Sequence, residues 1–525
     1  MKRKLIIPVI SMLCVLLFAA CSSKKSESEA YLNVLPDNSL AIAKMDFGKF
    51  LDESEILGNT FIKSAAGMGI SLVPEDMRTL LQSIYDNPTA AGININAPVY
   101  LAVTNVDPAG VVIAMAMDNM EAFENALLTF GQGEIEIVEQ DGMKHIVTNE
   151  DEVSCAYDSD KLILVVDDRY ADVTVFTELA ADDMAVNDKR FKNLFEGNDD
   201  QAAVYDLGAF GKELIRSGEV EPEFEPYIKM LKGCVMYVTV NFEKGYACQK
   251  VYVDMPKEYR ESLEKLIKKP TRSHFGYIPA NSFAVFNCNL DLTLANEALE
   301  SADVKEMLEE NGVTEEMARE ILKAVSGEYT AACWADGGDF ENIQGLVAVE
   351  CNDRIVFDML MSLVNSECDV TIVDSDVYAL NVNKREQYNY YTYEYETVVK
   401  GCDYYLMYKN GVIMLLPENL YNEICATGEL KPLVNNINKN GQFGSMGNLM
   451  VDFKPARDAA LVYLRNNNSS DVKVLFEVLD MFKSLTIDFD VDGYESRLDV
   501  NDDSVNSLKY LTDKIISIVV QNGGF

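Results

Sequence analysis

Histidine, tryptophan and positive charge are scarce in this sequence of 525 residues. It holds two histidines, His145 and His274, and one tryptophan, and its 85 acidic residues outnumber 45 basic ones for a net charge of -40. The two histidines lie far apart along the chain, so we expect ordinary structural roles for both. The acidic excess disfavours nucleic acid as a partner, because its phosphates would be repelled.

Motifs that carry catalysis are also missing. The sequence has no His-Glu-x-x-His, no Gly-x-Ser-x-Gly and no phosphate-binding loop. Ser262 and Lys265 satisfy Ser-x-x-Lys, but they lie in a charged helical pattern without companion motifs. Acid pairs are too common at this composition to indicate a glycosidase. We therefore predict no catalytic residue, no cofactor and no metal.

The cysteines do not form a disulfide framework. Two of the eleven, Cys14 and Cys21, belong to the N-terminal segment, which leaves an odd number. There is no Cys-x-x-Cys, and most of the rest lie within apolar runs such as residues 233–236. The pattern predicts buried free thiols that act as small apolar side chains.

Long apolar runs are absent except at the N-terminus, where Leu5 to Phe18 follows three basic residues. This run is short for a membrane span of about 20 residues, so residues 1–20 are predicted to be a signal peptide. The following Ala19-Ala20-Cys21 resembles the lipobox of bacterial lipoproteins, with Phe18 where leucine is usual. The resemblance implies a lipid on Cys21 and a tether over residues 21–30. The alternatives are an ordinary secretory signal and a membrane helix.

One octapeptide pattern occurs twice and organises the rest of the chain. Residues 35–42 (LPDNSLAI) return as residues 278–285 (IPANSFAV). Pro279 follows Pro36 by 243 residues, and Gly493 follows Gly245 by 248. Intermediate matches keep the same order, which is typical of internal duplication.

The predicted fold class is α+β, with two tandem homologous repeats over residues 31–270 and 271–525. Each repeat is expected to be an antiparallel sheet with helices packed mainly on one face. Specific elements include a strand over residues 39–47, a hairpin over residues 235–242 and 246–253, and a closing helix over residues 505–518.

A tyrosine-rich insertion in the second repeat is the candidate binding surface. It comprises Tyr388, Tyr390, Tyr391, Tyr393 and Tyr395. Aromatic faces stack on sugars and on partner proteins. The alternative is a plain extended hairpin, since Tyr and Thr favour strands.

An acidic turn near the C-terminus offers one metal hypothesis. Asp488, Asp490, Asp492 and Gly493 resemble the start of an EF-hand calcium loop, but Asp499 stands where glutamate supplies two oxygens. Alternating apolar residues and the Asp-Gly pair favour a β-hairpin instead.

The lipobox, the Leu-Pro-x-Asn-Ser strand opening and the duplicated layout together resemble an uncharacterised lipoprotein family of Bacteroidota, a domain of unknown function. The resemblance implies a lipid-anchored protein of the cell envelope, at the outer membrane. Residues 22–25 (SSKK) lack the acidic residues that mark surface export in that phylum, which favours the periplasmic side. The leading hypothesis is a non-enzymatic binding or scaffolding lipoprotein that contacts another envelope protein. The alternative is a glycan-binding or glycan-processing lipoprotein.

Overall fold

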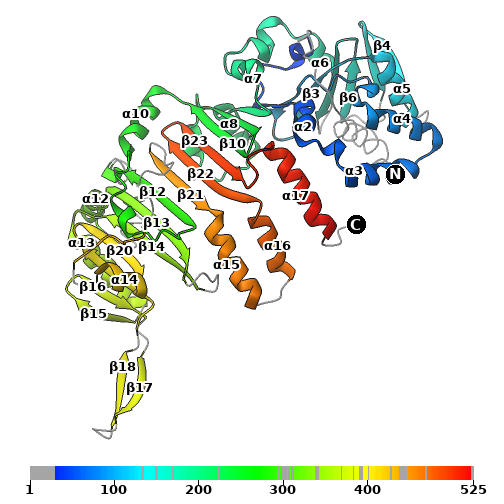
Figure 1. Cartoon of the computed structure of the whole chain (residues 1–525). Helices are drawn as coiled ribbons and strands as arrows, with labels where there is room; N and C mark the ends of the chain where they lie inside the picture. Colours follow the sequence, from blue (N-terminus) through cyan, green and yellow to red (C-terminus); the bar gives the residue numbers. More distant parts are fainter. Residues whose placement is uncertain are drawn as a thin grey trace. The chain divides into compact units, whose positions relative to one another are not determined.

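The computed structural model divides into two compact units (Figure 1). Unit 1 comprises Met1–Pro256 together with Asp502–Phe525, and unit 2 comprises Lys257–Asn501. The structure describes residues 30–521 except for gaps at 132–134, 148–151, 168–170, 223, 294–295, 297–298, 300–303, 306–307, 309–312, 337–341, 368, 382–383, 390–393, 400, 426–428, 437–445 and 467–469.

The strands of unit 1 all pair antiparallel. Hydrogen-bonded neighbours run in the order β4 (Glu136–Gln140), β5 (Met143–Val147), β6 (Val153–Tyr157), β7 (Lys161–Asp167), β3 (Gly110–Ala116), β2 (Val99–Asn105), β1 (Ala41–Met45), β8 (Gln201–Asp206), β9 (Val235–Glu243) and β10 (Tyr246–Asp254). In the centre, Ile42 of β1 lies opposite Ala102 on one side and Val204 on the other. The strand that begins at the end of the repeated octapeptide is therefore a central strand.

The helices of unit 1 are α2 (Phe47–Ser54), α3 (Thr60–Ser71), α4 (Glu75–Asp86), α5 (Met120–Gly131), α6 (Thr174–Thr177), α7 (Lys192–Glu196), α8 (Leu207–Ser217), α9 (Glu225–Lys229) and α17 (Ser507–Gln521), with short 3-10 turns η2 (Ala30–Val34), η3 (Ile56–Gly58), η4 (Pro88–Ala91), η5 (Ala181–Asp183) and η6 (Ala185–Asn187). Two of them, α2 and α8, begin directly where a strand ends, and the others follow turns or other helices. Asp46 caps α2 after β1, and Asp206 caps α8 after β8. An aspartate side chain accepts from the free N–H groups of the first turn, so each strand passes directly into a helix.

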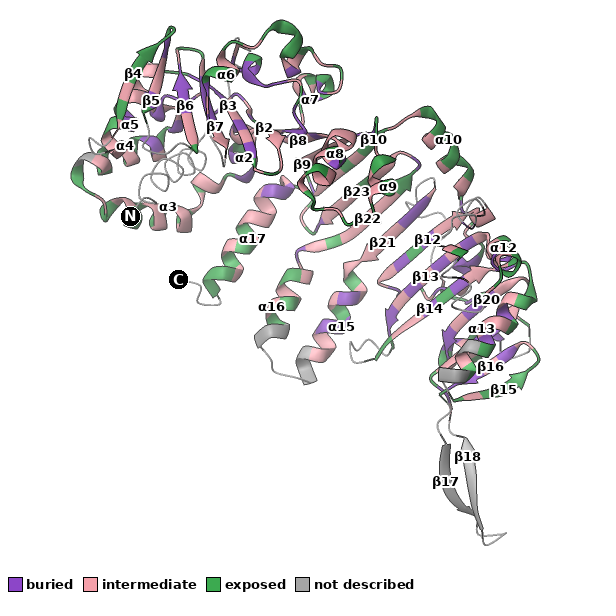
Figure 2. Ribbon diagram, turned by 180° about the vertical axis from the view of Figure 1, so that it is seen from behind, coloured by how far each residue is buried: buried purple, intermediate pink, exposed green. Residues whose placement is uncertain are grey.

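Around β7, both faces of the sheet in unit 1 are covered. Residues Leu162 to Val165 of β7 are all buried (Figure 2). Because successive strand side chains point to opposite faces, Ile163 joins a core with η2 and α7, whereas Leu162 joins a core with α4 and α5. Figures 1 and 2 show α4 and α5 on one side of β3 and β7, and α6 and α7 on the other. The prediction that helices lie mainly on one face is therefore wrong.

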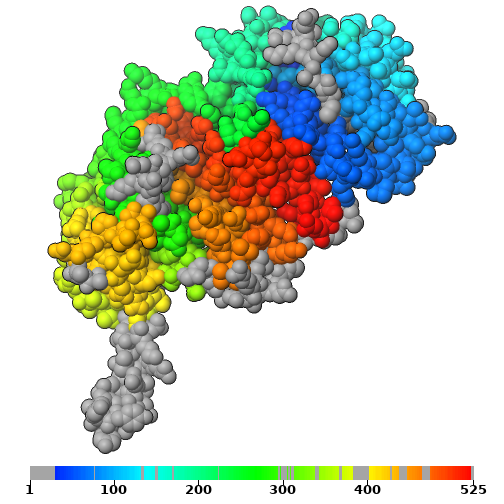
Figure 3. Space-filling view, in the orientation of Figure 1, coloured from blue at the N-terminus to red at the C-terminus, as the bar shows by residue number. Residues whose placement is uncertain are grey.

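The C-terminal helix α17 belongs to unit 1, where it packs beside α2 and the β9–β10 turn. Asn506, which precedes the helix, donates from its side chain to the carbonyl of Phe242 at 2.6 Å. Asn59 donates to Asp513 at 3.1 Å, and Lys509 pairs with Glu55. Figure 3 shows the red C-terminal residues against the blue residues of this region.

Unit 2 has its own antiparallel strands. Their neighbours run in the order β15 (Val370–Asp374), β16 (Val377–Leu380), β19 (Tyr404–Lys409), β20 (Val412–Pro417), β14 (Ile343–Glu350), β13 (Gly327–Ala335), β12 (Ala284–Leu290), β21 (Gly447–Asp452), β22 (Phe482–Asp490) and β23 (Gly493–Val500), with β11 (Ile267–Lys268) on the end of β12. Its helices are α10 (Lys257–Leu266), η7 (Ser273–Tyr277), α12 (Glu315–Ala324), α13 (Arg354–Glu367), α14 (Glu418–Cys425), α15 (Phe453–Asn466) and α16 (Ser470–Leu479). Trp334 is buried in its core with Phe275 and Met414.

A polar group lies inside unit 2. Asn287 of β12 and Glu328 of β13 are both fully buried. The Asn287 side chain donates to Glu328 Oε1 and to Thr330 Oγ1, both at 2.9 Å. Glu328 Oε2 also accepts from the backbone N–H of Thr271 at 2.9 Å. These bonds compensate the cost of burying the carboxylate.

The predicted pair of tandem repeats, each with its own sheet, is wrong. Apart from one two-stranded ribbon, the described strands belong to a single antiparallel sheet of 21 strands. The repeated pattern encodes local strands and turns, but it carries no signal for whether sheet edges stay free or pair. Unpaired N–H and C=O groups at a sheet edge favour further pairing, which a local pattern does not reveal.

Several local predictions agree closely with the observed elements. The strand predicted over residues 39–47 is β1, and the closing helix predicted over residues 505–518 is α17. The predicted hairpin is formed by β9 and β10, which turn at Lys244-Gly245 with a positive φ of 80° at the glycine. The predicted boundary at residue 270 stays a prediction. Within the described residues, no helix has the length and apolar character needed to span a bilayer.

Candidate functional site

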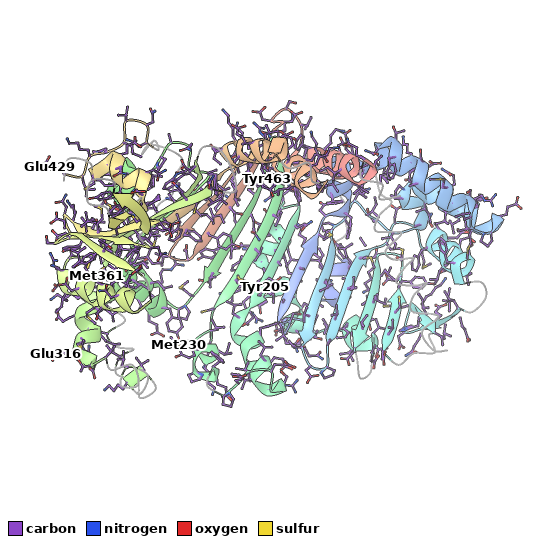
Figure 4. The ribbon with its side chains drawn as sticks, turned by 90° about the horizontal axis from the view of Figure 1, so that it is seen from below. Tyr205, Met230, Glu316, Met361, Glu429 and Tyr463 are labelled. Carbon is purple, nitrogen blue, oxygen red and sulfur yellow. The ribbon has the colours of Figure 1, made fainter. Side chains whose placement is uncertain are left out.

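A cavity in unit 1 is the best-formed candidate site. It has a volume of about 840 Å³ and is lined by α8, α9, the segment after α9 and the adjoining ends of β9 and β10. Figure 4 labels two residues of this region, Tyr205 just before the cap of α8 and Met230 just after α9. Pockets that hold small molecules span about 300–1,000 Å³, so this cavity has the size of a ligand site.

Two glycines bring α8 close to the segment that follows α9. A Cβ added at Gly208 would lie 3.0 Å from the Cα of Lys232, and one added at Gly211 would lie 2.6 Å from Cγ2 of Ile228. Asp206 fixes the start of the helix by accepting from the Ala209 N–H at 2.8 Å. The close approach places residues 228–233 as one wall of the cavity and α8 as the other.

Arg190 is held rigidly at the edge of the cavity. Its guanidinium donates to Asp188 Oδ2 at 2.6 Å, to Asp206 Oδ2 at 2.5 Å and to the carbonyl of Asp37 at 2.6 Å. Hydrogen bonds to Asp188, together with those to Asp206, raise the pKa of Arg190 above its ordinary value. Partial burial opposes ionisation of Asp188, but the bonds from Arg190 outweigh it and lower the pKa of that carboxyl. The charge of Arg190 is thus already compensated by Asp188 and Asp206, and its hydrogen bonds hold these residues and the Asp37 carbonyl in place.

The remaining charged groups on the cavity are three lysines and one aspartate. Lys229 pairs with Glu225 at 2.7 Å, one turn earlier on α9. Lys212 and Lys232 are exposed, and within the described part of the chain neither ammonium group has a hydrogen-bond or ion-pair partner. Among the described residues, two carboxylates line the cavity. Asp206 accepts from Arg190, whereas Asp254, at the end of β10, does not.

Apolar side chains complete the wall. Ile215 of α8, Ile228 of α9 and Val235 of β9 line the cavity together with Ala209. None of the described residues that line it is a serine, cysteine or histidine. The arrangement is therefore suited to hold an apolar body beside ammonium groups.

A second, smaller hollow of about 320 Å³ lies over the central strands of unit 1. Its lining is largely apolar and includes Met45, Leu101, Ile113 and Val238. Leu101 is 36% exposed in this hollow. Of its described lining, Lys44 and Gln201 are polar, and the Lys44 ammonium donates to the carbonyl of Gly197, so the hollow is a weaker candidate than the larger cavity.

The tyrosine insertion forms a separate two-stranded ribbon of β17 (Lys384–Asn389) and β18 (Glu394–Val399). The backbone positions of Tyr388 and Tyr395 lie opposite each other in this ribbon. Tyr390, Tyr391 and Tyr393 lie outside the described residues. The extended hairpin is thus present, while its role as a binding surface for a protein or glycan stays a prediction.

Cys21, the predicted lipidation residue, also lies outside the described residues. Eight of the other cysteines are free thiols, five of them buried. Burial raises the pKa of Cys155 to about 12 and, with a contribution from Glu328, that of Cys288 to about 11. The five buried thiols agree with the prediction of buried free cysteines, whereas Cys248, Cys288 and Cys333 are partly exposed.

The histidines and the acidic turn are not brought together. His145 lies in β5, and the buried His274 lies in η7 with Nδ1 3.2 Å from Thr330 Oγ1. Asp488 and Asp490 belong to the β22–β23 hairpin, and Asp492 at its turn pairs with Arg260 at 2.6 Å. Across the described residues, no cluster of three or more His, Cys, Asp or Glu is placed to hold a metal ion.

Sequence reasoning missed the residues of the larger cavity. Arg190, Lys212 and Lys232 come from three separate segments and follow no motif spacing. The available signal was the scarcity of basic residues, which makes the three lysines between residues 212 and 232 noticeable in an acidic chain.

Comparisons with known proteins give a family and little else. No curated protein matches the chain. Among solved structures, crystal form III of TP0453 is 10% identical over 44% of this chain and 82% of its own, with a TM-score of 0.26. Crystal form IV of the same protein is 12% identical over 46% and 88%, with a TM-score of 0.25. Scores this low carry no argument about fold or function.

A family model extends over most of the chain. It covers residues 31–415, which include every described strand of unit 1 and much of unit 2. Its description names no activity, ligand or partner. The chain belongs to the family described as Domain of unknown function (DUF4836).

Proposed function

We propose that this chain is a lipid-anchored protein of the bacterial cell envelope that binds other molecules without chemically altering them. The observation that carries the binding role is the cavity of about 840 Å³ in unit 1, with apolar walls and two lysines, Lys212 and Lys232, that have no ion-pair partner among the described residues. The anchor rests on the N-terminal sequence, in which Cys21 follows a basic and then an apolar segment. The proposed location is the outer membrane, facing the periplasm, in a member of the Bacteroidota.

The binding role is tested by native mass spectrometry of the full chain purified in detergent from its own membranes. The expected spectrum contains a species heavier than the lipidated chain by the mass of one bound molecule. A matched variant, Val235→Trp, fills the cavity, so this species should be lost while the circular dichroism spectrum stays unchanged. A chain that carries only its anchor, in wild type and variant alike, would contradict the binding role.

The anchor is tested separately by labelling producing cells with an alkyne-tagged palmitate. The wild-type chain should carry the label and partition with membranes, whereas Cys21→Ser should do neither. Cys234→Ser is the matched control, since that thiol is buried in unit 1 and should not affect labelling. Equal labelling of the wild type and Cys21→Ser would refute lipidation at Cys21.

A further inference from the structure

We infer that the ligand of the unit 1 cavity is an anionic amphiphile, a molecule with one carboxylate or phosphate head and an apolar body. The inference rests on the proposed binding function and names the class of ligand for it. Two features carry it, the unpaired ammonium groups of Lys212 and Lys232 and the apolar wall behind them.

The lining of the cavity is richer in basic side chains than the chain as a whole. Acidic residues outnumber basic ones by 85 to 45 overall, yet the lining contains four basic and two acidic side chains. Arg190 is neutralised by Asp188 and Asp206, and Lys229 is paired with Glu225. Outside these pairs, the lining presents two ammonium groups and the Asp254 carboxylate to a ligand, while the second carboxylate beside Arg190 offsets one of the two positive charges.

Lys212 and Lys232 line the cavity from two different segments of unit 1. Lys212 lies in the middle of α8, and Lys232 lies in the segment that packs against Gly208 at the start of that helix. Two ammonium groups suit an anionic head, because it both accepts charge-assisted hydrogen bonds and compensates the positive charges. A neutral head accepts hydrogen bonds but leaves the charges uncompensated, and a cationic head is repelled.

The apolar part of the ligand has a matching surface. Ile215, Ile228 and Val235 form the inner wall. Next to it, the short segment around α9 exposes Phe224 (53%) and Met230 (57%). Large apolar side chains this exposed mark contact surfaces, so a tail that extends beyond the cavity has apolar groups to lie against.

The test measures binding of a dansyl-labelled undecanoic acid to the purified full chain by fluorescence. Dodecanoate and dodecyl phosphate are the two anionic competitors, and they separate a preference for carboxylate from one for phosphate. Dodecyltrimethylammonium and dodecyl maltoside carry the same tail on a cationic and a neutral head. The two anions should displace the probe, and the other two should not.

Substitutions of the charged lining residues test whether the probe binds in the cavity. Lys212→Ala and Lys232→Ala should each weaken probe binding about fivefold to tenfold, as expected for loss of a charge-assisted hydrogen bond. Asp254→Asn should tighten binding, because it removes the competing carboxylate. Lys192→Ala is the control, since Lys192 is exposed, lies in the same unit and pairs with Glu196 outside the cavity.

The following results would overturn the inferred ligand class or separate it from the binding function. Displacement by dodecyl maltoside as effective as that by dodecanoate would overturn it, as would unchanged affinity in both lysine variants. Binding only to phosphatidylglycerol vesicles, without binding of the monomeric probe, would also overturn it, because the surface would then contact a membrane. If native mass spectrometry shows a retained molecule while the anionic competitors fail, the ligand class is wrong and the binding function stands.

Discussion

Glu53 of α2 is expected to destabilise unit 1 at alkaline pH. Its side chain is 20% exposed, lies 4.0 Å from Lys49, and leaves Oε2 without a hydrogen-bond partner among the described groups. Burial, with the added charges of Asp200 and Glu243, raises its pKa to about 7, despite the opposing effects of Lys49 and Asn506. The folded chain therefore holds a proton on Glu53 that the unfolded chain loses near its ordinary pKa of 4.5.

The sign and size of the effect follow from this difference. Because the folded pKa is raised, the stabilising contribution of the bound proton is complete below pH 4.5 and is lost as pH rises through about 7. At about 1.4 kcal/mol for each tenfold change in proton affinity, the full cost of ionisation would be roughly 3 kcal/mol. Solvent reaches part of this site, and screening reduces the expected cost to about 1 to 2 kcal/mol.

Glu53→Gln keeps the shape and removes the charge. It should raise the free energy of unfolding of unit 1 by about 1 to 2 kcal/mol at pH 8 and leave it nearly unchanged at pH 5. The assay is urea unfolding followed by far-ultraviolet circular dichroism at both pH values. Trp334, the single tryptophan of the sequence, lies in unit 2, so its fluorescence follows that unit in the same samples.

Glu139→Gln is the matched control, because Glu139 is exposed in β4 of the same unit. It should change stability at neither pH. Equal stabilisation by Glu53→Gln at pH 5 and pH 8 would refute the reasoning, since it would show that charge is not the cause. A loss of stability at pH 8 would show that the ionised carboxylate makes a favourable contact.

Three further predictions concern packing and thiols. Asn287→Ala should destabilise unit 2 by about 2 kcal/mol, because it leaves the buried Glu328 short of a hydrogen bond; urea unfolding monitored by Trp334 fluorescence measures this, and an unchanged midpoint would contradict it. Gly208→Ala should cost about 1 to 2 kcal/mol in unit 1 and weaken probe binding, since its Cβ would meet backbone at 3.0 Å; Gly58→Ala, with open space around it, serves as control. Cys155, whose burial raises its pKa to about 12, should react with iodoacetamide at pH 8 only after unfolding in urea, and rapid labelling of the native chain would show that the thiol is accessible.

Local structure was predictable because its causes are local. The β9–β10 hairpin follows from alternating apolar residues around Lys244-Gly245, where the glycine takes a positive φ. The α17 helix follows from its apolar spacing. In β7 the run Leu162 to Val165 is apolar at every position, which already indicated a strand buried on both faces. Giving that run more weight would have corrected the prediction of helices mainly on one face.

Tertiary features were not predictable from these patterns. The single sheet depends on which edges pair, and neither edge carries a distinct residue signature. The cavity depends on Gly208 and Gly211 meeting residues 228–233, a contact made in space by segments about 20 residues apart. Lys212 and Lys232 can be recognised as residues of one cavity only once that contact is known.

The position of α17 bears on how the chain is made. Unit 2 is contained within one continuous stretch, whereas unit 1 needs residues from both before and after it. A ribosome therefore finishes every residue of unit 2 before it supplies the helix that packs on α2. Until then the Phe242 carbonyl at the β9–β10 turn lacks the Asn506 side-chain N–H that donates to it, so the packing of unit 1 is completed by residues made after unit 2.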